Sequence, residues 1–428
     1  MPIRDADLLG HGNPGYHVRH YDLELAYKPS TGRLSGTAGI VAVAAEPLPA
    51  MALDLGSFTV DRLKVDERPA RWNHRDGKLR VRFGRTIPAG TEFLVRLRYA
   101  GRPSPVRTRH WGELGWDELT DGVIVASQPI GASSWFPCND DVSDKATFRL
   151  GLTVPAGYTV VASGVLAGET PAGTTTRWEY LQDAPTAPYL ATVQIGRYER
   201  LKLGERQHAA VPRARLRAFR HDFARQPRMM SLFTDLFGPY PFAEYGVVVT
   251  DDELEVPVEA QGLSVFGANH VDGRRTYERL VAHELAHQWF GNSVGLAHWG
   301  DIWLNEGFAA YAEWLWSERS GGRPAATIAA VSRANLAALP QNLMIGEPVA
   351  RDMFDDRVYQ RGALTLHALR RTVGDRAFFA ILREWTGTYR HATATTEAFA
   401  AVAQRHTAID LGPLFAGWLY APGLPTLD

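Results

Sequence analysis

The sequence is poor in cysteine, in net charge and in long apolar runs, and each shortage excludes a class of protein. Its 428 residues contain one cysteine, Cys138, so no intrachain disulfide can form. The net charge of −1 gives no basic surface for nucleic acid or an anionic membrane. No run approaches the roughly 18 apolar residues of a membrane helix, and residues 1–16 lack the features of a signal peptide. These absences predict a soluble, cytoplasmic protein without a nucleic-acid or membrane partner.

The first half of the chain is predicted to be β-structure. Between Tyr21 and Tyr27 every second residue is large and apolar, which is the period of a half-buried strand. The same alternation recurs at residues 79–83 and 93–99, with turn-forming glycines between the segments. Several short strands of this kind predict an antiparallel β domain, a sandwich or saddle, over residues 1–203.

The second half changes to helical spacing. Apolar residues recur every three or four positions in residues 225–238, 275–292, 303–322 and 361–375, and several of these segments end in Gly or Asn. This predicts a mostly helical domain over residues 204–428 and an α+β fold class for the whole chain. Because no Pro/Gly/Ser linker marks the boundary, we expect the two domains to pack closely.

The most informative stretch is HELAHQWFGN. On a helix, His283 and His287 fall one turn apart on the same face, so their imidazoles can converge on one ion. Zinc suits neutral imidazole nitrogen and keeps one position for water in a catalytic site. Glu284 lies about 100° round the helix from His283. From there it can act as a general base without binding the metal.

A catalytic zinc needs a third protein ligand, and Glu306 in WLNEGFAAYAEW is the candidate. The 18 residues between His287 and Glu306 allow the first helix to end near Gly291-Asn292 and a second helix to return alongside. Glu313 lies two helical turns beyond Glu306 and therefore on the same face. It could accept the second ring N–H of a ligand histidine.

Less specific explanations exist for each of these residues. H-E-x-x-H arises by chance in roughly a few chains per hundred, and a helix-spaced histidine pair is often a surface feature. The added Glu306, inside an aromatic-rich helix, favours a zinc hydrolase over coincidence. Taken alone, Glu259 is typical of a solvated acidic loop, Tyr359 of half-buried packing, and the tryptophans of the second helix of core.

These motifs resemble the aminopeptidase N family of zinc peptidases, which also includes leukotriene hydrolase. That family carries H-E-x-x-H, then 18 residues and a Glu, with W-F-G-N after the first motif and W-L-N-E-G-F-A around the second; this chain has HELAHQWFGN and WLNEGFAAY. The resemblance implies that His283, His287 and Glu306 bind one zinc ion per chain and that Glu284 is the base. It also implies a thermolysin-like zinc-peptidase domain.

Further stretches extend the resemblance. VPVEAQGLSVF stands where the family carries G-A-M-E-N, which implies that Glu259 holds the substrate's α-amine and that Gly262 belongs to the same substrate-binding segment. VYQRGALTL is similar to the family's Y-E-K-G segment, which implies that Tyr359 donates a hydrogen bond to the tetrahedral intermediate. SSWFPCNDDVSDKATF is similar to F-P-C-x-D-E-P-x-x-K-A-T-F. Just upstream, Gln128 is similar to a family Gln that contributes to recognition of the N-terminus.

The chain departs from the family in two places. Val256, Pro257, Val258 and Ala260 replace G, A, M and N, so that only Glu259 and Gly262 persist from that segment. The chain also stops at LFAGWLYAPGLPTLD, where family members usually continue into a domain that caps the site. We therefore expect a compact two-domain form with an open cleft and the active site between the domains.

The sequence thus predicts a zinc aminopeptidase that acts, as a monomer, on short peptides with a free N-terminus. Two alternatives stay open: a zinc endopeptidase with a relaxed N-terminus requirement, and a catalytically retired member that serves as a binding module. The intact set of zinc ligands, base and Tyr359 argues against the retired module. Nothing in the sequence indicates the lipid pocket that an epoxide hydrolase like leukotriene hydrolase would need.

Overall fold

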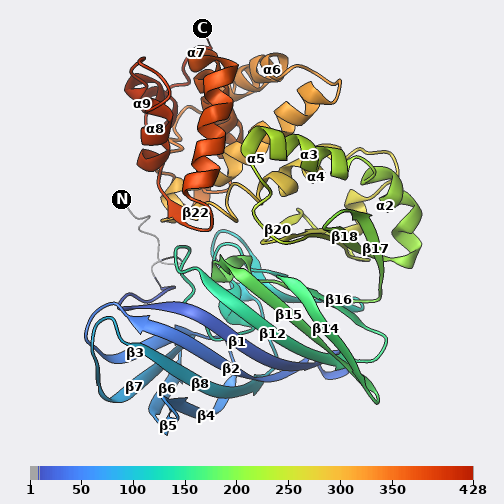
Figure 1. The fold of residues 1–428 in the computed structure, drawn as a ribbon, viewed down its shortest axis with the longest axis vertical. Helices are drawn as coiled ribbons and strands as arrows, with labels where there is room; N and C mark the ends of the chain where they lie inside the picture. Colours follow the sequence, from blue (N-terminus) through green and yellow to red (C-terminus); the bar gives the residue numbers. More distant parts are fainter. Residues whose placement is uncertain (1–7, 9, 428) are drawn as a thin grey trace.

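Two layers make up the structure, one built mainly from strands and the other mainly from helices. The computed structural model describes residue 8 and residues 10–427. Figure 1 shows the blue and green strands of the first half below and the orange and red helices of the second half above. This arrangement confirms the predicted α+β fold. None of the helices in the described part of the chain is long and apolar enough to cross a membrane.

The largest sheet is built from long strands whose alternate residues are buried. In β1 (Tyr16–Lys28), for example, Tyr21, Leu23 and Leu25 are buried, as their spacing predicted. The strand order is β14 (Val165–Ala172), β15 (Thr175–Thr186), β12 (Ala146–Pro155), β1, β2 (Arg33–Ala44), β8 (Glu92–Gly101), β4 (Thr59–Val65) and β5 (Arg68–Pro69). Neighbours are antiparallel except β1 and β12, which run parallel with Leu23 opposite Leu150. The sequence did not predict that pair, because its partners lie far apart along the chain.

Two smaller sheets pack with the large one around a shared core. One has the order β3 (Leu48–Asp54), β7 (Lys78–Ile87), β6 (Arg71–Arg75); the other has β13 (Thr159–Ala162), β16 (Val193–Gly196), β11 (Gly122–Ala126), β10 (Glu113–Leu119), β9 (Val106–Arg107). Leu23, Val81 and Val125, one from each sheet, belong to this core. The thiol of Cys138 is buried in it as well, and the backbone of Cys138 pairs with that of Asp54.

The second half of the chain contains a sheet of its own. Its order is β17 (Tyr198–Gly204), β18 (Gln207–Pro212), β19 (Tyr245–Val249), β21 (Leu263–Phe266), β20 (Val258–Ala260), so β20 is an edge strand. The three central strands are parallel and the two outer ones antiparallel to their neighbours. β17 spans the predicted domain boundary between residues 203 and 204 and pairs with β18. The boundary itself stays a prediction. A short pair, β22 (Gly295–Leu296) and β23 (Thr393–Ala394), lies among the helices.

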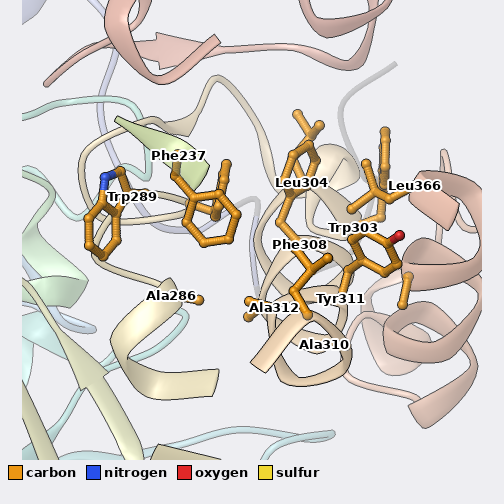
Figure 2. Packing of buried hydrophobic residues seen from close by; sticks show 14 of the residues in the cluster. Phe237, Ala286, Trp289, Trp303, Leu304, Phe308, Ala310, Tyr311, Ala312 and Leu366 are labelled. Carbon is orange, nitrogen blue, oxygen red and sulfur yellow. The ribbon is translucent and has the colours of Figure 1, made fainter. Parts of the chain in front are cut away.

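Helices pack on one face of this sheet and form the second core with it. On the other face, Val248 of the sheet clusters with Ile124 of β11 and Val161 of β13. The helices are α2 (Leu216–Asp222), α3 (Gln226–Phe237), α4 (Glu278–Ala286), α5 (Trp303–Arg319), α6 (Ala325–Ala337), α7 (Asp356–Thr388), α8 (Thr396–Gln404) and α9 (Gly412–Leu419). Short 3-10 turns are η1 (Pro29–Thr31), η2 (Ala132–Ser134), η3 (Pro188–Leu190), η4 (Arg213–Arg215), η5 (Ala268–His270), η6 (Trp299–Asp301) and η7 (Ala350–Asp352). Figure 2 shows Trp303, Phe308 and Tyr311 of α5 packed between Phe237 and Leu366, so the aromatic-rich helix is core.

Helix α4 ends earlier than its sequence suggested. We expected it to continue to about residue 291, but it ends at Ala286, and His287 is the first residue beyond it. The N–H groups of residues 292–294 donate to the carbonyls of residues 287–289, and Gly291 has φ +110°. The backbone therefore closes a wide turn directly after the second histidine, which helical periodicity alone does not reveal.

Polar contacts join the two halves next to this turn. Lys145, which precedes β12, donates from Nζ to the backbone oxygens of Asn292 (2.9 Å) and Ser293 (2.8 Å). On the other side, Gln261 donates from Nε2 to Oγ1 of Thr186 at 2.6 Å. These contacts hold the wide turn and the β20–β21 connection against the first half of the chain.

Candidate active site

The two histidines and the glutamate predicted to bind zinc come together between α4 and α5. His283 lies in α4, His287 follows its last residue, and Glu306 lies in the first turn of α5. Nε2 of His283 and Nε2 of His287 each lie 3.5 Å from Oε2 of Glu306. The ligand atoms of all three lie within 4.8 Å of one another, and all three residues are buried. Such a group has the size and chemistry of a metal site.

Hydrogen bonds fix which nitrogen of each histidine faces that site. Nδ1 of His283 lies 2.8 Å from Oε1 of Glu313, and Nδ1 of His287 lies 3.1 Å from the backbone oxygen of Phe290. Because these oxygens accept, each Nδ1 carries a proton and each Nε2 offers its lone pair. Zinc bonds of about 2.0–2.1 Å in a tetrahedron would separate the ligand atoms by about 3.3 Å. The observed 3.5 Å is close to that, so the residues fit zinc.

Glu284 is a buried carboxyl with a free oxygen in the same site. Within the described part of the chain, its Oε2 has no hydrogen-bond partner. Burial raises the pKa of Glu284 to about 7, against the opposing effect of His283. Burial also raises the pKa of Glu306, but His287 and His283 outweigh it and lower that pKa to about 2. One carboxyl is thus suited to exchange a proton near neutral pH, while the other stays ionised.

The two residues predicted to hold the substrate's amine reach the same cleft. Glu259 lies in the edge strand β20, and its carboxylate belongs to a group with Glu284 and His287 whose ligand atoms lie within 4.8 Å. Gln128 also lines the cleft, and its Nε2 is buried without a hydrogen-bond partner in the described chain. A carboxylate and an amide therefore lie beside the metal ligands, where a peptide amine could bind.

Hydrogen bonds that the sequence did not reveal tie β20 to the metal-binding turn. Gln288 donates from Nε2 to the backbone oxygen of Ala260 at 3.2 Å, and Asn292 donates from Nδ2 to the same oxygen at 2.9 Å. The N–H of Gly262, which has φ +77°, donates to Oε1 of Gln288 at 2.8 Å. These bonds fix Glu259 relative to the metal ligands. Gly262 is bound to Gln288 and does not line the cleft, so its role in substrate binding stays a prediction.

Tyr359, in the first turn of α7, lies beside the metal ligands. Its ring stacks near that of His283, with centroids 6.1 Å apart and planes inclined by 18°. Burial raises its pKa well above the ordinary value, and the carboxylates of Glu306 and Glu259 add to the effect. The hydroxyl therefore stays protonated and can donate a hydrogen bond.

The cleft around these residues has a volume of about 550 Å³ and is lined from both halves of the chain. Trp111, Leu114 and Gln128 come from the first half, and the ring of Trp111 lies edge-on to Phe354 of the second, with centroids 6.3 Å apart. Sequence reasoning missed Trp111, Leu114 and Phe354, because no local pattern marks them. It also missed Arg279, although its position one turn before the first histidine on α4 was a usable signal.

Known proteins share this sequence pattern and this fold. Residues 222–418 match the model of the peptidase family M1 domain. A two-domain M1 zinc metallopeptidase variant, solved with L-tryptophan, is 32% identical; the match covers 97% of each chain with a TM-score of 0.89. An M1 zinc metallopeptidase variant from Deinococcus radiodurans, solved with a Tyr-Ser-Ala substrate, is also 32% identical over 97% of each chain, with a TM-score of 0.88.

More distant relatives are longer than this chain. Aminopeptidase M1-D of Oryza sativa subsp. japonica is 25% identical over 445 residues, which are 96% of this chain and 50% of that protein. The chain thus spans about half the length of the curated relatives it matches. Leukotriene A4 hydrolase from Saccharomyces cerevisiae shares the fold at 20% identity and a TM-score of 0.80, over 96% of this chain and 69% of that one.

Proposed function

The chain belongs to the peptidase family M1. From this premise we propose that it is a peptidase that removes the N-terminal residue from short peptides. The position of Glu259 carries the proposal, because its carboxylate lies within 4.8 Å of the ligand atoms of Glu284 and His287. In a peptide the α-amine nitrogen and the first carbonyl carbon are only about 2.5 Å apart. An amine held by Glu259, with help from Gln128, therefore presents the first peptide bond to the reacting groups.

The reacting groups each have one task in this proposal. His283, His287 and Glu306 would hold one zinc ion, which when bound polarises the scissile carbonyl and lowers the pKa of water. Glu284 accepts a proton from the attacking water and delivers it to the leaving nitrogen. The hydroxyl of Tyr359 donates a hydrogen bond to the oxygen that becomes negative.

One chain is sufficient for this activity. Each residue with a proposed role belongs to the same polypeptide, so a monomer with one zinc ion can carry out the reaction. The single buried Cys138 fits a reducing compartment such as the cytoplasm.

The first test compares one tripeptide with a free N-terminus and its N-acetylated form, with and without a zinc chelator. We expect that only the free form is cut, from its first residue, and that chelation stops the reaction.

Glu284→Gln should abolish turnover while one zinc ion per chain stays bound, measured by elemental analysis. Near-normal activity of that variant would contradict the role of Glu284.

Other results would favour the other functions open to this chain. Cleavage of the acetylated peptide would favour an endopeptidase in which the V-P-V-E-A segment no longer requires the amine. Zinc content close to zero, with no cleavage of either peptide, would favour a binding module.

A further inference from the structure

The charges that line the cleft are unevenly distributed. Carboxylates dominate, and they belong to Glu255, Glu259, Glu284, Glu306, Glu313 and Asp356. Among the lining residues in the described chain, Arg279 is the only lysine or arginine. A peptide brings an ammonium group at one end and a carboxylate at the other. Most of this wall repels the carboxylate, and Arg279 is the position that attracts it.

Arg279 and the proposed amine site lie at opposite ends of one stretch of α4. Glu259 groups with Glu284 and His287, so the amine site is next to the residue that follows the helix. Arg279 is the second residue of α4, one turn before His283. At about 1.5 Å per residue, the stretch from Arg279 to His287 corresponds to about 12 Å along the helix axis. The metal ligand His283 lies between these two positions on the helix.

The guanidinium of Arg279 has N–H donors that the described residues do not use. Its Nη1 lies 3.3 and 3.5 Å from the two carboxylate oxygens of Glu313, which are long contacts. Nε and Nη2 have no hydrogen-bond partner among the described residues, and the side chain is 66% exposed. A guanidinium with two free N–H groups can bind a carboxylate through both of its oxygens.

We propose that Arg279 binds the C-terminal carboxylate of the peptide whose amine Glu259 holds. This inference rests on the proposed aminopeptidase function and narrows its substrates to peptides about three residues long with a free carboxylate. An extended residue spans about 3.3–3.6 Å, so a tripeptide extends over about 10 Å. That length is close to the helix-axis distance of about 12 Å between the positions of Arg279 and His287. Much longer chains cannot bring their carboxylate to Arg279 while the first peptide bond is being cut.

The test compares a tripeptide that has a free C-terminal carboxylate with its C-terminal amide. In the native enzyme we expect kcat/KM for the acid to exceed that for the amide by about tenfold, mainly through KM, as for one charge-assisted hydrogen-bonded pair. Arg279→Gln should bring the ratio to about one. Because Arg279 is exposed, high salt should also lower the ratio in the native enzyme.

A binding measurement separates recognition from turnover. In the Glu284→Gln background, which should not cut the peptides, titration calorimetry gives their Kd values directly. We expect the acid to bind about tenfold more tightly than the amide when Arg279 is present, and equally when it is replaced by Gln. Arg274→Gln is the matched control, because Arg274 is an exposed arginine of the preceding loop that does not line the cleft. The Arg274→Gln variant should still bind the acid about tenfold more tightly than the amide.

Two results would overturn the proposal. The first is a kcat/KM for the acid that equals that for the amide in the native enzyme, or a preference for the acid that is unchanged in Arg279→Gln. The second concerns the source of the carboxylate: a tripeptide amide that ends in Asp offers one from its side chain. If that peptide were cut with the same kcat/KM as the free acid, Arg279 would not be specific for the C-terminal carboxylate. Failure of the aminopeptidase function itself would look different, because neither the acid nor the amide would then be cut.

Discussion

Tyr359 shows how the surroundings of one residue select its chemical state. Its ring lies beside that of His283, and burial together with the carboxylates of Glu306 and Glu259 raises the pKa of its hydroxyl. An ionised phenolate would be repelled by those carboxylates and would have no proton to give. At any pH near neutral the side chain is therefore a hydrogen-bond donor, suited to an oxygen that gains negative charge during the reaction.

Replacing this hydroxyl should affect the rate and leave substrate affinity unchanged. We expect Tyr359→Phe to lower kcat by about 10²–10³-fold with little change in KM, because the contact forms only as the oxyanion develops. Steady-state kinetics with a tripeptide measures this. Tyr389→Phe, at the other end of α7, is the control and should keep normal kinetics. An unchanged kcat for Tyr359→Phe would remove this residue from the mechanism.

At the scale of single residues, the spacing of the sequence predicted the metal ligands and the base of the candidate site. It did not predict the residues from distant segments that line the cleft. His283, Glu284 and His287 are neighbours on one helical segment, so a period of 3.6 residues brings them together without knowledge of the fold. Trp111 and Phe354 meet only because the two halves of the chain pack against each other. No pattern within either segment encodes that contact, so sequence reasoning did not find it.

Helices α5 and α7 are in close contact at a pair of glycines, and this crossing connects two parts of the site. A Cβ atom on Gly307 would lie 2.7 Å from Cα of Gly362, and the converse distance is also 2.7 Å. Gly307 follows Glu306 directly, and Gly362 lies one turn after Tyr359. The separation between a metal ligand and the proposed hydroxyl donor thus depends on two helices in backbone contact.

A methyl group at this crossing should push the helices apart. We expect Gly362→Ala to lower the free energy of unfolding by about 1–3 kcal/mol through overpacking and to reduce kcat/KM. Urea unfolding and peptide hydrolysis measure the two effects. A Cβ atom on Gly387, in the part of α7 that follows its break at Gly374, would meet nothing within 4 Å. Gly387→Ala should therefore be neutral, or more stable by about 0.5–1 kcal/mol. If Gly362→Ala and Gly387→Ala had the same free energy of unfolding and the same kcat/KM, the crossing of α5 and α7 would tolerate a side chain.

The helices and strands whose apolar residues recur with a clear period were predictable from the sequence. The pairing of strands that lie far apart along the chain was not. Alternation identified β1, β7 and β8, and three-and-four spacing identified α3 and α5. The parallel pairing of β1 with β12 joins strands that are separated by many others, and no local signal specifies it. The early end of α4 depends on the wide turn and on Gly291, which override the helical period of the sequence.

At the scale of the whole molecule, the first half of the chain supports the metal site from outside. Lys145 binds the backbone oxygens of Asn292 and Ser293, which end the turn that begins at His287. The same turn contains the oxygen of Phe290, which accepts the hydrogen bond from Nδ1 of His287. A displacement of the two halves would therefore alter the orientation of a metal ligand.

Removing this contact should weaken stability and activity together. We expect Lys145→Met to lower the free energy of unfolding by about 1–3 kcal/mol, because two carbonyls lose their donor. The kcat/KM for a tripeptide should fall as well, since the turn then holds His287 less firmly. Thermal unfolding and kinetics measure both quantities, with Lys202→Met as an exposed control. Normal stability and normal kcat/KM in Lys145→Met would show that the turn does not need this support.

The single thiol, enclosed between the sheets of the first half, gives the molecule a practical property. Cys138 is buried and is the one cysteine in the sequence, so the folded protein offers reagents no reactive sulfur. Cysteines introduced at chosen surface positions on either side of the cleft would be the only ones to take up a fluorophore or spin label. Energy transfer or dipolar spectroscopy could then follow, in solution and without a prior cysteine-free background, whether the mouth of the cleft narrows when a peptide enters.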